Sequence, residues 1–416
     1  MSVAHRTSSA NSDAYAMPLA KIDVSRADLY EHDAQWPYFE RLRKEDPVHY
    51  CAESEFGPFW SITKFDDIVK VETNHAAFSS NRDIVIGDQL DFAPPMFIAM
   101  DPPRHDEQRK AVTPAVSPAR LMELEPIIRE RAGKILDGLP RNKTFNWVDH
   151  VSIELTTQML AILFDFPFEE RHLLPYWSDV TTSAETVGVR TLPPGKREQV
   201  LHECLAYFMR LWHERAANPN PKFDFISLLA HNPATRDMHK DPMEFLGNLM
   251  LLIVGGNDTT RNSLSGGVVA LNRFPGEYDK LRANASLIPS MVSEIIRYQT
   301  PLAHMRRTAK MDAVVGNKTI RKGDKVIMWY ISGNRDDTAI ERPNDFIIDR
   351  ANPRHHLSFG FGIHRCMGNR VAEMQLKIVW EEIMKRFDRI ELVGEPVRTR
   401  SNFVHGFTEV PVRIAG

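Results

Sequence analysis

Cysteine is scarce in this sequence, which excludes a fold held together by disulfide bonds. The chain has 416 residues and three cysteines, Cys51, Cys204 and Cys366. Three is too few, and an odd number, for a disulfide framework. A reducing compartment is consistent with this usage, so we expect a cytoplasmic protein.

Long apolar runs and a strong net charge are also missing. The most apolar stretch, residues 246–254, is much shorter than the roughly 20 residues that span a membrane. Residues 1–20 lack the apolar centre of a signal peptide. A formal net charge of −3 gives no reason to expect nucleic acid as a partner. These absences favour a soluble protein without a membrane anchor.

The residue patterns predict a mainly α-helical protein with small β-sheets. We expect residues 1–25 to be disordered and residues 26–416 to form a single domain. Residues 80–103 form a long irregular segment, which is uncommon in a compact domain unless it is functional. Helices are predicted at 66–73, 241–273 and 369–387 and through much of 104–272, and strands at 48–51, 59–63, 313–315, 318–320 and 325–331.

One segment, Phe-Gly-Phe-Gly-Ile-His-Arg-Cys-Met-Gly at residues 359–368, carries most of the chemical information. It holds a single cysteine between glycines, directly before a helical pattern. A lone cysteine is most often a small buried apolar residue. However, a helix N-terminus, a nearby cation or a metal lowers the pKa of a thiol, and each could act on Cys366. The segment therefore predicts a loop that presents one sulfur atom.

The long helix predicted after Asp241 contains a run that breaks the usual rules. Asp241 and Pro242 form a typical helix start, and the pattern continues for about 32 residues, or about 48 Å. In its middle stand Gly255, Gly256, Asn257, Asp258 and Thr259. These residue types are poor helix formers, and a buried carboxylate is costly unless paired. Such a conflict indicates a functional segment, or two helices that meet at a turn.

The cysteine loop resembles the haem-binding loop of the cytochrome P450 family. Its pattern, Phe-x-x-Gly-x-His-x-Cys-x-Gly, is met by Phe359, Gly362, His364, Cys366 and Gly368. The resemblance implies the single-domain fold of that family, a triangular prism with a long central helix over the haem. It also implies haem b as cofactor and O2 as co-substrate. Cys366 would be the axial iron ligand, whose thiolate favours O–O bond cleavage.

The anomalous run of the central helix is similar to the oxygen-binding segment of the same family. By that resemblance Gly255 and Gly256 make room over the iron. Thr259 holds the hydrogen-bond network around O2, and Asp258 feeds protons to it. Asn257 occupies the variable position and is expected to line the pocket.

Two propionates of haem need basic partners, because burying a carboxylate costs several kcal/mol unless it is paired. His105 and Arg109 lie at i and i+4 of a predicted helix and are similar to a propionate-binding pair of the family. Arg306 matches a third such position, although its neighbour Arg307 leaves that assignment open. His364 is the fourth candidate.

Glu294 and Arg297 resemble the structural Glu-x-x-Arg pair of the family, and Arg350 is the candidate for its third member. Taken alone, a Glu-x-x-Arg spacing usually indicates an exposed ion pair on a helix, which stabilises the helix by about 0.2–0.5 kcal/mol. The resemblance instead implies a network that supports folding and haem retention.

The finer resemblance is to soluble bacterial enzymes that hydroxylate alkanes and fatty acids at the chain terminus. Residues 252–263, 96–103 and 356–370 carry it. Such enzymes receive electrons from a ferredoxin and an NAD(P)H-dependent ferredoxin reductase, and an acidic ferredoxin would meet Lys110, Arg365 and Arg370. The resemblance places these residues near the substrate: Ile84, Ile86, Leu90, Phe97, Leu251, Val254, Asn257, Leu302 and Phe407.

Other functions remain open at this point. The same scaffold could hydroxylate terpenes or other compact apolar molecules. A peroxide-driven enzyme is disfavoured because Asp258 and Thr259 suit the use of O2. In a different class, a zinc-binding protein could use His355, His356, His364 and Cys366, although paired Cys-x-x-Cys spacing is absent.

Overall fold

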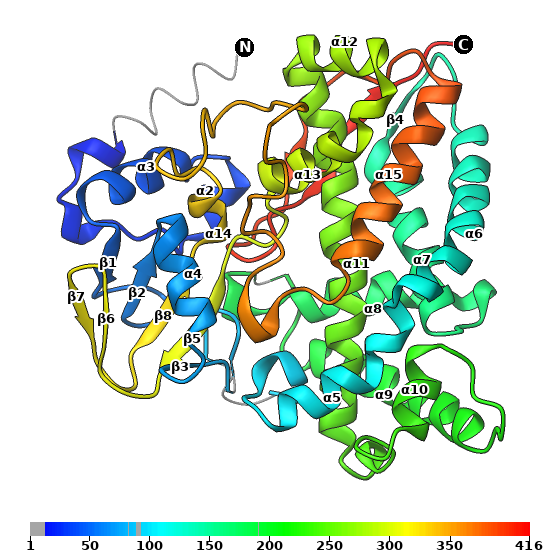
Figure 1. The fold of residues 1–416 in the computed structure, drawn as a ribbon, viewed down its shortest axis with the longest axis horizontal. Coiled ribbons are helices and arrows are strands. Elements are labelled where there is room, and N and C mark those ends of the chain that lie inside the picture. The colour runs from blue at the N-terminus through cyan, green and yellow to red at the C-terminus, as the bar shows by residue number, and fades with distance from the viewer. Residues whose placement is uncertain (1–12, 82, 89–92, 190) are drawn as a thin grey trace.

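The computed structural model describes residues 13–416 except residues 82, 89–92 and 190 (Figure 1). The helices are α2 (Ala27–Glu31), α3 (Trp36–Glu45), α4 (Phe65–Thr73), α5 (Arg104–Val112), α6 (Pro118–Asp137), α7 (Glu154–Leu163), α8 (Leu173–Thr182), α9 (Lys196–Ala216), α10 (Phe225–His231), α11 (Pro242–Arg273), α12 (Pro275–Ala283), α13 (Ile288–Gln299), α14 (Tyr330–Gly333) and α15 (Asn369–Arg386). The strands are β1 (Val48–Cys51), β2 (Phe59–Ile62), β3 (Phe78–Ser79), β4 (Thr144–Asn146), β5 (Met305–Ala309), β6 (Ala313–Val315), β7 (Lys318–Ile320), β8 (Lys325–Met328), β9 (Glu391–Leu392), β10 (Val397–Arg398), β11 (Phe407–Glu409) and β12 (Pro411–Arg413).

Most of the helices lie on the opposite side of the molecule from the main sheet (Figure 1). The sheet has five strands in the order β1-β2-β8-β5-β3, and α2, α3 and α4 lie on its side of the molecule. Helix α11 runs through the helical side and packs against α7, α8 and α13. The mainly helical fold with small sheets, predicted from the sequence, is confirmed.

Helix α11 is continuous from Pro242 to Arg273, so the alternative of two helices meeting at a turn is wrong. The side chain of Asp241 caps it by accepting a hydrogen bond from the Glu244 amide at 3.2 Å. Inside the glycine-containing run, the Thr259 hydroxyl donates to the Gly255 carbonyl at 2.9 Å. Packing on the neighbouring helices outweighs the poor local propensity of this run.

Two local predictions differ from the structure. Residues 13–25, which we expected to be disordered, are packed, and Ile22 and Val24 are buried with the side chains of α2 and α3. The strand expected at 325–331 ends at Met328, where Trp329 turns the chain into α14. The buried indole of Trp329 donates to the Ser61 hydroxyl at 3.0 Å, which fixes this turn.

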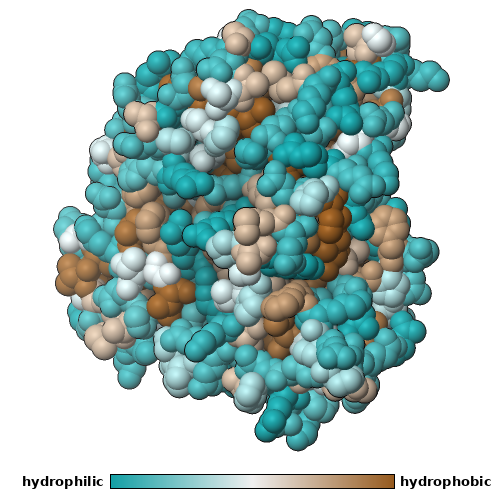
Figure 2. All heavy atoms as spheres, turned by 45° about the vertical axis from the view of Figure 1, so that its right-hand side comes forward, coloured by the Kyte–Doolittle hydropathy of each residue, from teal (hydrophilic) through white to brown (hydrophobic). Residues whose placement is uncertain are grey.

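Hydrophilic side chains cover most of the face shown in Figure 2, and hydrophobic ones form separate small patches on it. None of the helices in the described part of the chain combines the length and the apolar character that a bilayer span requires.

Candidate active site

The loop before α15 holds Cys366 in a fixed position. The Cys366 amide donates to the Phe359 carbonyl at 2.8 Å, which closes the loop on itself. Gly362 has a φ of +66°, and a Cβ there would lie 2.8 Å from the Glu72 carbonyl oxygen of α4. Only glycine satisfies both the left-handed backbone and this close approach.

Cys366 opens onto an internal cavity of about 300 Å3, which Phe359, His364 and Gly368 also line. Burial raises the pKa of the Cys366 thiol, while a hydrogen bond from the Gly368 amide and the charges of Arg109 and Arg365 oppose that rise. The helix terminus and the cations therefore do not by themselves give the lowered pKa expected from the sequence. A coordinated metal ion would supply the missing stabilisation of the thiolate.

Helix α11 forms another wall of the cavity through Gly255, Gly256 and Thr259. A Cβ on Gly255 would meet nothing within 4 Å, so this residue leaves the cavity open. A Cβ on Gly256 would lie 2.6 Å from Leu160 of α7, so this residue allows the two helices to approach. The two glycines thus have different roles.

Asp258 and Asn257 are not among the residues that line the cavity. The Asn257 side chain accepts a hydrogen bond from the Thr156 hydroxyl at 2.9 Å, so the prediction that it lines the pocket is wrong. Successive helical residues point about 100° apart, which turns Asn257 away when Gly255 and Thr259 face the cavity.

The Asp258 carboxylate is fully buried and faces α8. It lies 2.6 Å from Nη2 of Arg261 and 3.3 Å from the Ser178 hydroxyl. Burial raises its pKa to about 6, although Arg261 opposes that rise. Arg261 also reaches the half-exposed Asp179 at 2.9 Å, so a charged chain leads from Asp258 to the surface.

Four basic side chains gather at one edge of the cavity: His105, Arg109, Arg307 and His364. The rings of His105 and His364 lie 4.3 Å apart. Within the described residues, Nε2 of His105 and Nδ1 of His364 are buried and have no hydrogen-bond partner. Buried polar atoms normally have partners, so this edge is suited to an acidic group.

Arg307, and not Arg306, belongs to this edge. The Arg306 guanidinium donates to Asp88 at 2.6 Å and to the Ile86 carbonyl at 3.3 Å, on the other side of β5. Because successive residues of a strand point to opposite faces, only one of the two arginines can face the cavity. The Arg306 prediction is therefore corrected to Arg307, which lies 3.7 Å from Glu72.

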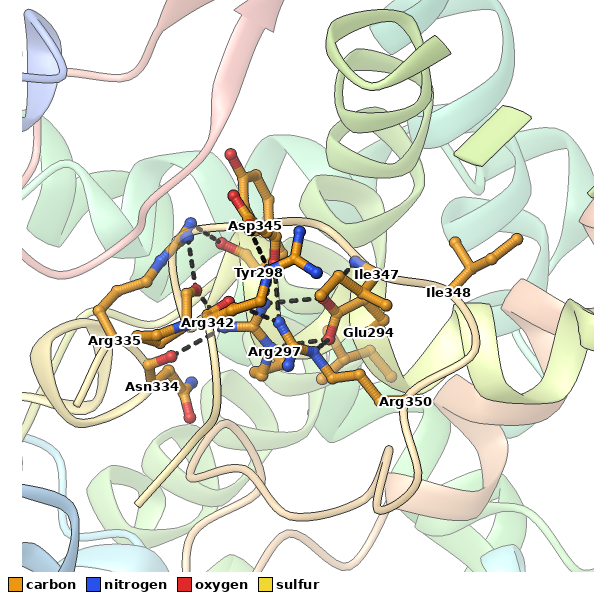
Figure 3. Close-up of polar contacts among 12 residues, drawn as sticks. Glu294, Arg297, Tyr298, Asn334, Arg335, Arg342, Asp345, Ile347, Ile348 and Arg350 are labelled. Carbon is orange, nitrogen blue, oxygen red and sulfur yellow. Dashed lines mark hydrogen bonds and ion pairs between the residues drawn. The ribbon is translucent and has the colours of Figure 1, made fainter. Parts of the chain in front are cut away.

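Glu294, Arg297 and Arg350 form the predicted network of ion pairs (Figure 3). Arg297 holds both carboxylate oxygens of Glu294 at 2.7 Å, and Arg350 holds one at 3.0 Å. Arg297 also donates to the carbonyl groups of Asn334 and Pro343, at 2.9 and 2.7 Å. The network therefore fixes irregular backbone between α14 and the loop.

Apolar side chains line the rest of the cavity. Among the predicted pocket residues, the structure places these in the lining: Ile84, Phe97, Leu251, Val254 and Leu302. Ile86 and Phe407 are buried elsewhere, and Leu90 lies outside the described residues. No sequence pattern pointed to these further lining residues: Val85, Arg197, Leu201, Met250 and Phe403.

Described residues of the irregular segment 80–103 line the cavity, and the part around Phe97 is fixed to α11. The Phe97 amide donates to the Asn248 side chain at 3.0 Å. A Cβ on Gly247 would lie 2.0 Å from the Pro95 carbonyl oxygen, so only glycine allows this approach. Part of the segment that we expected to be functional thus lies in the cavity lining.

These features fit a haem group. The Cys366 sulfur lies across the cavity from Gly255, which leaves space on the α11 side. At one edge, His105 and His364 have buried nitrogens without hydrogen-bond partners, which suits the two propionates. The zinc alternative lacks such support, because no three His, Cys, Asp or Glu side chains in the described ranges are grouped as metal ligands. Lys110, Arg365 and Arg370 are exposed.

Comparison with known proteins agrees with this site. The family described as Cytochrome P450 matches residues 194–413. The structure of CYP153D17 from a Sphingomonas species is 46% identical, with a TM-score of 0.90, over 95% of this chain and 99% of that one. Linalool 8-monooxygenase of Pseudomonas putida is 35% identical over 94% of this chain and 98% of its own length. Methyl-branched lipid omega-hydroxylase of Mycobacterium bovis is 29% identical over 95% of each chain.

The matches extend over nearly the whole chain, beyond the cysteine loop alone. They confirm the resemblance to bacterial enzymes that the sequence motifs indicated. The chain therefore belongs to the cytochrome P450 family and is a monooxygenase of the class that uses haem iron and O2.

Proposed function

We propose that this monooxygenase hydroxylates the terminal carbon of medium-chain alkanes or fatty acids. The observation that carries the proposal is the apolar cavity between Cys366 and the Gly255–Thr259 segment of α11. An apolar chain gains about 25 cal/mol per Å2 of surface that it buries there. The similarity to a methyl-branched lipid omega-hydroxylase supports the terminal position.

In this proposal Cys366 would hold haem b at the iron, and His105, Arg109, Arg307 and His364 would hold its propionates. Haem iron with a thiolate ligand supplies the activation of O2. The protein contributes a dry, shaped site: Phe359 and Gly368 line the cavity beside the sulfur, and Gly255 leaves room opposite.

Thr259 and Asp258 are the proposed residues for proton handling. The Thr259 side chain faces the cavity and can hold a water molecule once its hydroxyl turns from the Gly255 carbonyl. Asp258 faces α8 and can exchange its proton with solvent along Arg261 and Asp179. Its carboxyl group has to rotate toward Thr259 to deliver that proton, and a pKa of about 6 suits a group that both binds and releases a proton near neutral pH.

The electron donor is proposed to be a ferredoxin, reduced by an NAD(P)H-dependent ferredoxin reductase. Lys110, Arg365 and Arg370 are exposed cations near the cysteine loop, and they would attract an acidic partner. A steep fall in the reduction rate as salt rises supports this docking surface. A flat salt profile contradicts it.

The products decide the substrate class. The haem-loaded enzyme is supplied with ferredoxin, reductase and NADPH, together with octane, dodecanoic acid or linalool, and the products are identified by mass spectrometry. Alcohol at the terminal carbon of the linear substrates supports the proposal. The alternative is hydroxylation of terpenes, which the similarity to linalool 8-monooxygenase favours. Turnover of linalool with none of the linear chains would replace the proposal by that alternative.

A further inference from the structure

Asn257 is not among the residues that line the cavity, yet it contacts the acid proposed to deliver protons. Its amide nitrogen donates to Oδ1 of Asp258 at 3.2 Å. Its amide oxygen accepts from the Thr156 hydroxyl of α7 at 2.9 Å. All three residues are completely buried. Asn257 therefore bridges α7 and the Asp258 carboxylate.

The neighbours of the Asn257 amide determine its direction. An ionised carboxylate only accepts hydrogen bonds, so the NH2 group of the amide has to face Asp258. The amide oxygen then faces α7, where the Thr156 hydroxyl is a donor. The reversed amide would bring its oxygen against the carboxylate. Asn257 is thus held in one direction as long as Asp258 is ionised.

Three donors hold the ionised Asp258 in place. Arg261 and Asn257 of α11 contact Oδ1 at 2.6 and 3.2 Å. The Ser178 hydroxyl of α8 donates to Oδ2 at 3.3 Å. Burial raises the pKa of Asp258 to about 6 and the negative charge of Asp179 adds to that rise, while the three donors oppose it. The ionised form therefore depends on these donors.

Protonation of Asp258 weakens this hold. Hydrogen bonds to an ionised group are roughly twice as strong as those between neutral groups. The proton also turns one of the two carboxyl oxygens into a donor, which no longer suits a neighbouring N–H group. The neutral carboxyl group is thus freer than the carboxylate to leave α8 and turn toward the cavity.

We propose that Asn257 is a positioning residue for proton delivery: its amide keeps the ionised Asp258 carboxylate facing α8, so that the group turns to the cavity only after it has taken up a proton. The inference rests on the role in proton handling proposed above for Asp258, and it deepens that role. Asn257 acts through Asp258, because its own side chain is not part of the cavity lining.

Asn257→Leu tests the hold on the carboxylate. Leucine has the same branched shape but no donor, and the Thr156 hydroxyl can turn to the Ser152 carbonyl, 3.0 Å away. Since the ionised Asp258 loses a hydrogen bond, its pKa should rise by about one unit. Infrared difference spectra of the haem-loaded, full-length enzyme, recorded from acid to mildly alkaline pH, follow the carbonyl band of the protonated carboxyl group. The band that is missing in Asp258→Asn belongs to Asp258.

Two further variants complete the series. Thr156→Val removes the donor that fixes the Asn257 amide and should raise the midpoint of the band by a smaller amount. Ser265→Ala is the matched control, because Ser265 is also buried in α11 and its hydroxyl bonds to the Ser152 hydroxyl at 2.9 Å. It lies about 10.5 Å beyond Asp258 along the helix axis, so the midpoint should stay unchanged.

An unchanged midpoint in Asn257→Leu, or an equal rise in Ser265→Ala, overturns the proposal. Should Asn257→Leu fail to fold, Thr156→Val decides by the same criterion.

A second measurement separates this inference from the proposed role of Asp258. The share of NADPH that ends in product is measured against pH for the wild type, Asn257→Leu and Asp258→Asn. Because the protonated acid delivers the proton, the alkaline decline of that share should move to higher pH in Asn257→Leu, by about the same one unit. A shifted infrared midpoint without this movement overturns the link to proton delivery. An unaltered profile in Asp258→Asn contradicts the proton role itself, while the infrared midpoint still decides whether Asn257 holds the carboxylate.

Discussion

The guanidinium of Arg261 lies 2.6 Å from the carboxylate of Asp258, and the same guanidinium reaches Asp179 at 2.9 Å. Asp258 is fully buried, whereas the side chain of Asp179 is 54% exposed. Arg261 follows Asp258 by three residues, so one turn of α11 supplies both the buried acid and its link to the surface. This arrangement makes the charge of Asp258 sensitive to pH.

The Asp258→Asn variant tests that sensitivity. The folded-state pKa of Asp258, about 6, lies above its ordinary value of 3.8. Its contribution to stability is therefore complete below about pH 3.8 and is lost as pH rises through 6. Between pH 4.5 and pH 7, the Tm of the wild type should fall relative to that of Asp258→Asn. Thermal unfolding followed by circular dichroism measures both values. A rise in the Tm of the wild type relative to that of the variant would mean that the ion pair with Arg261 outweighs the cost of burying the charge.

Cys366→Ser tests the iron ligand. Serine keeps the size of the side chain but provides no thiolate, so the reduced carbon monoxide complex should lose the absorption band that is typical of thiolate ligation. The distant thiol variant Cys204→Ser, whose side chain is buried in the helical core, should keep the band. Persistence of the band in Cys366→Ser would refute the assignment.

Thr259→Ala tests the hydroxyl on the cavity wall. Haem content and substrate binding should be retained, while a larger share of the reducing equivalents should appear as hydrogen peroxide, because proton delivery is disturbed. The measurement is the ratio of NADPH consumed to product formed. Thr259→Ser should restore most of the coupling, since it keeps the hydroxyl. Normal coupling in the alanine variant would remove this role.

Arg306 and Arg307 form a natural pair for comparison. Arg307→Gln removes a charge from the proposed propionate edge, and the share of protein that retains haem should fall, measured from the ratio of haem to protein absorbance. Arg306→Gln removes the contact with Asp88 and should keep its haem. Equal losses in the two variants would show that local folding, and not the edge, is responsible.

Glu294→Ala should be strongly destabilising, although Glu294 is remote from substrate. It would leave the fully buried Arg297 without its carboxylate, a loss of about 3–5 kcal/mol for a broken buried pair. Arg342→Gln is the control, because the Arg342–Asp345 pair is exposed and such pairs contribute about 0.2–1 kcal/mol. Denaturant unfolding measures both, and similar values for the two variants would contradict a structural network.

The sequence predicted the parts of the site that depend on local patterns. The loop around Cys366, the start and end of α11, and the pairing of Glu294 with Arg297 follow from residues close together in the chain. The choice between Arg306 and Arg307 depends on which face of the sheet each side chain of β5 points to. The residues next to them in the sequence do not determine this.

Other positions depend on tertiary packing. Asn257 stands two residues from Gly255, and its direction is set by the contact with Thr156 of α7. Arg197 lies 169 residues before Cys366 and belongs to no motif, so only the folded chain brings it to the cavity. Asp258 was identified by its motif, but its orientation toward α8 required the ion pair with Arg261.

The difference between the two adjacent glycines of α11 has a consequence for altering the enzyme. A methyl group on Gly255 would extend into open space, whereas one on Gly256 would press on the fully buried Leu160. A side chain at position 255 should therefore take up space that the bound cofactor and substrate need, while one at position 256 should push α11 away from α7. Two adjacent positions thus affect the reaction site and the scaffold separately.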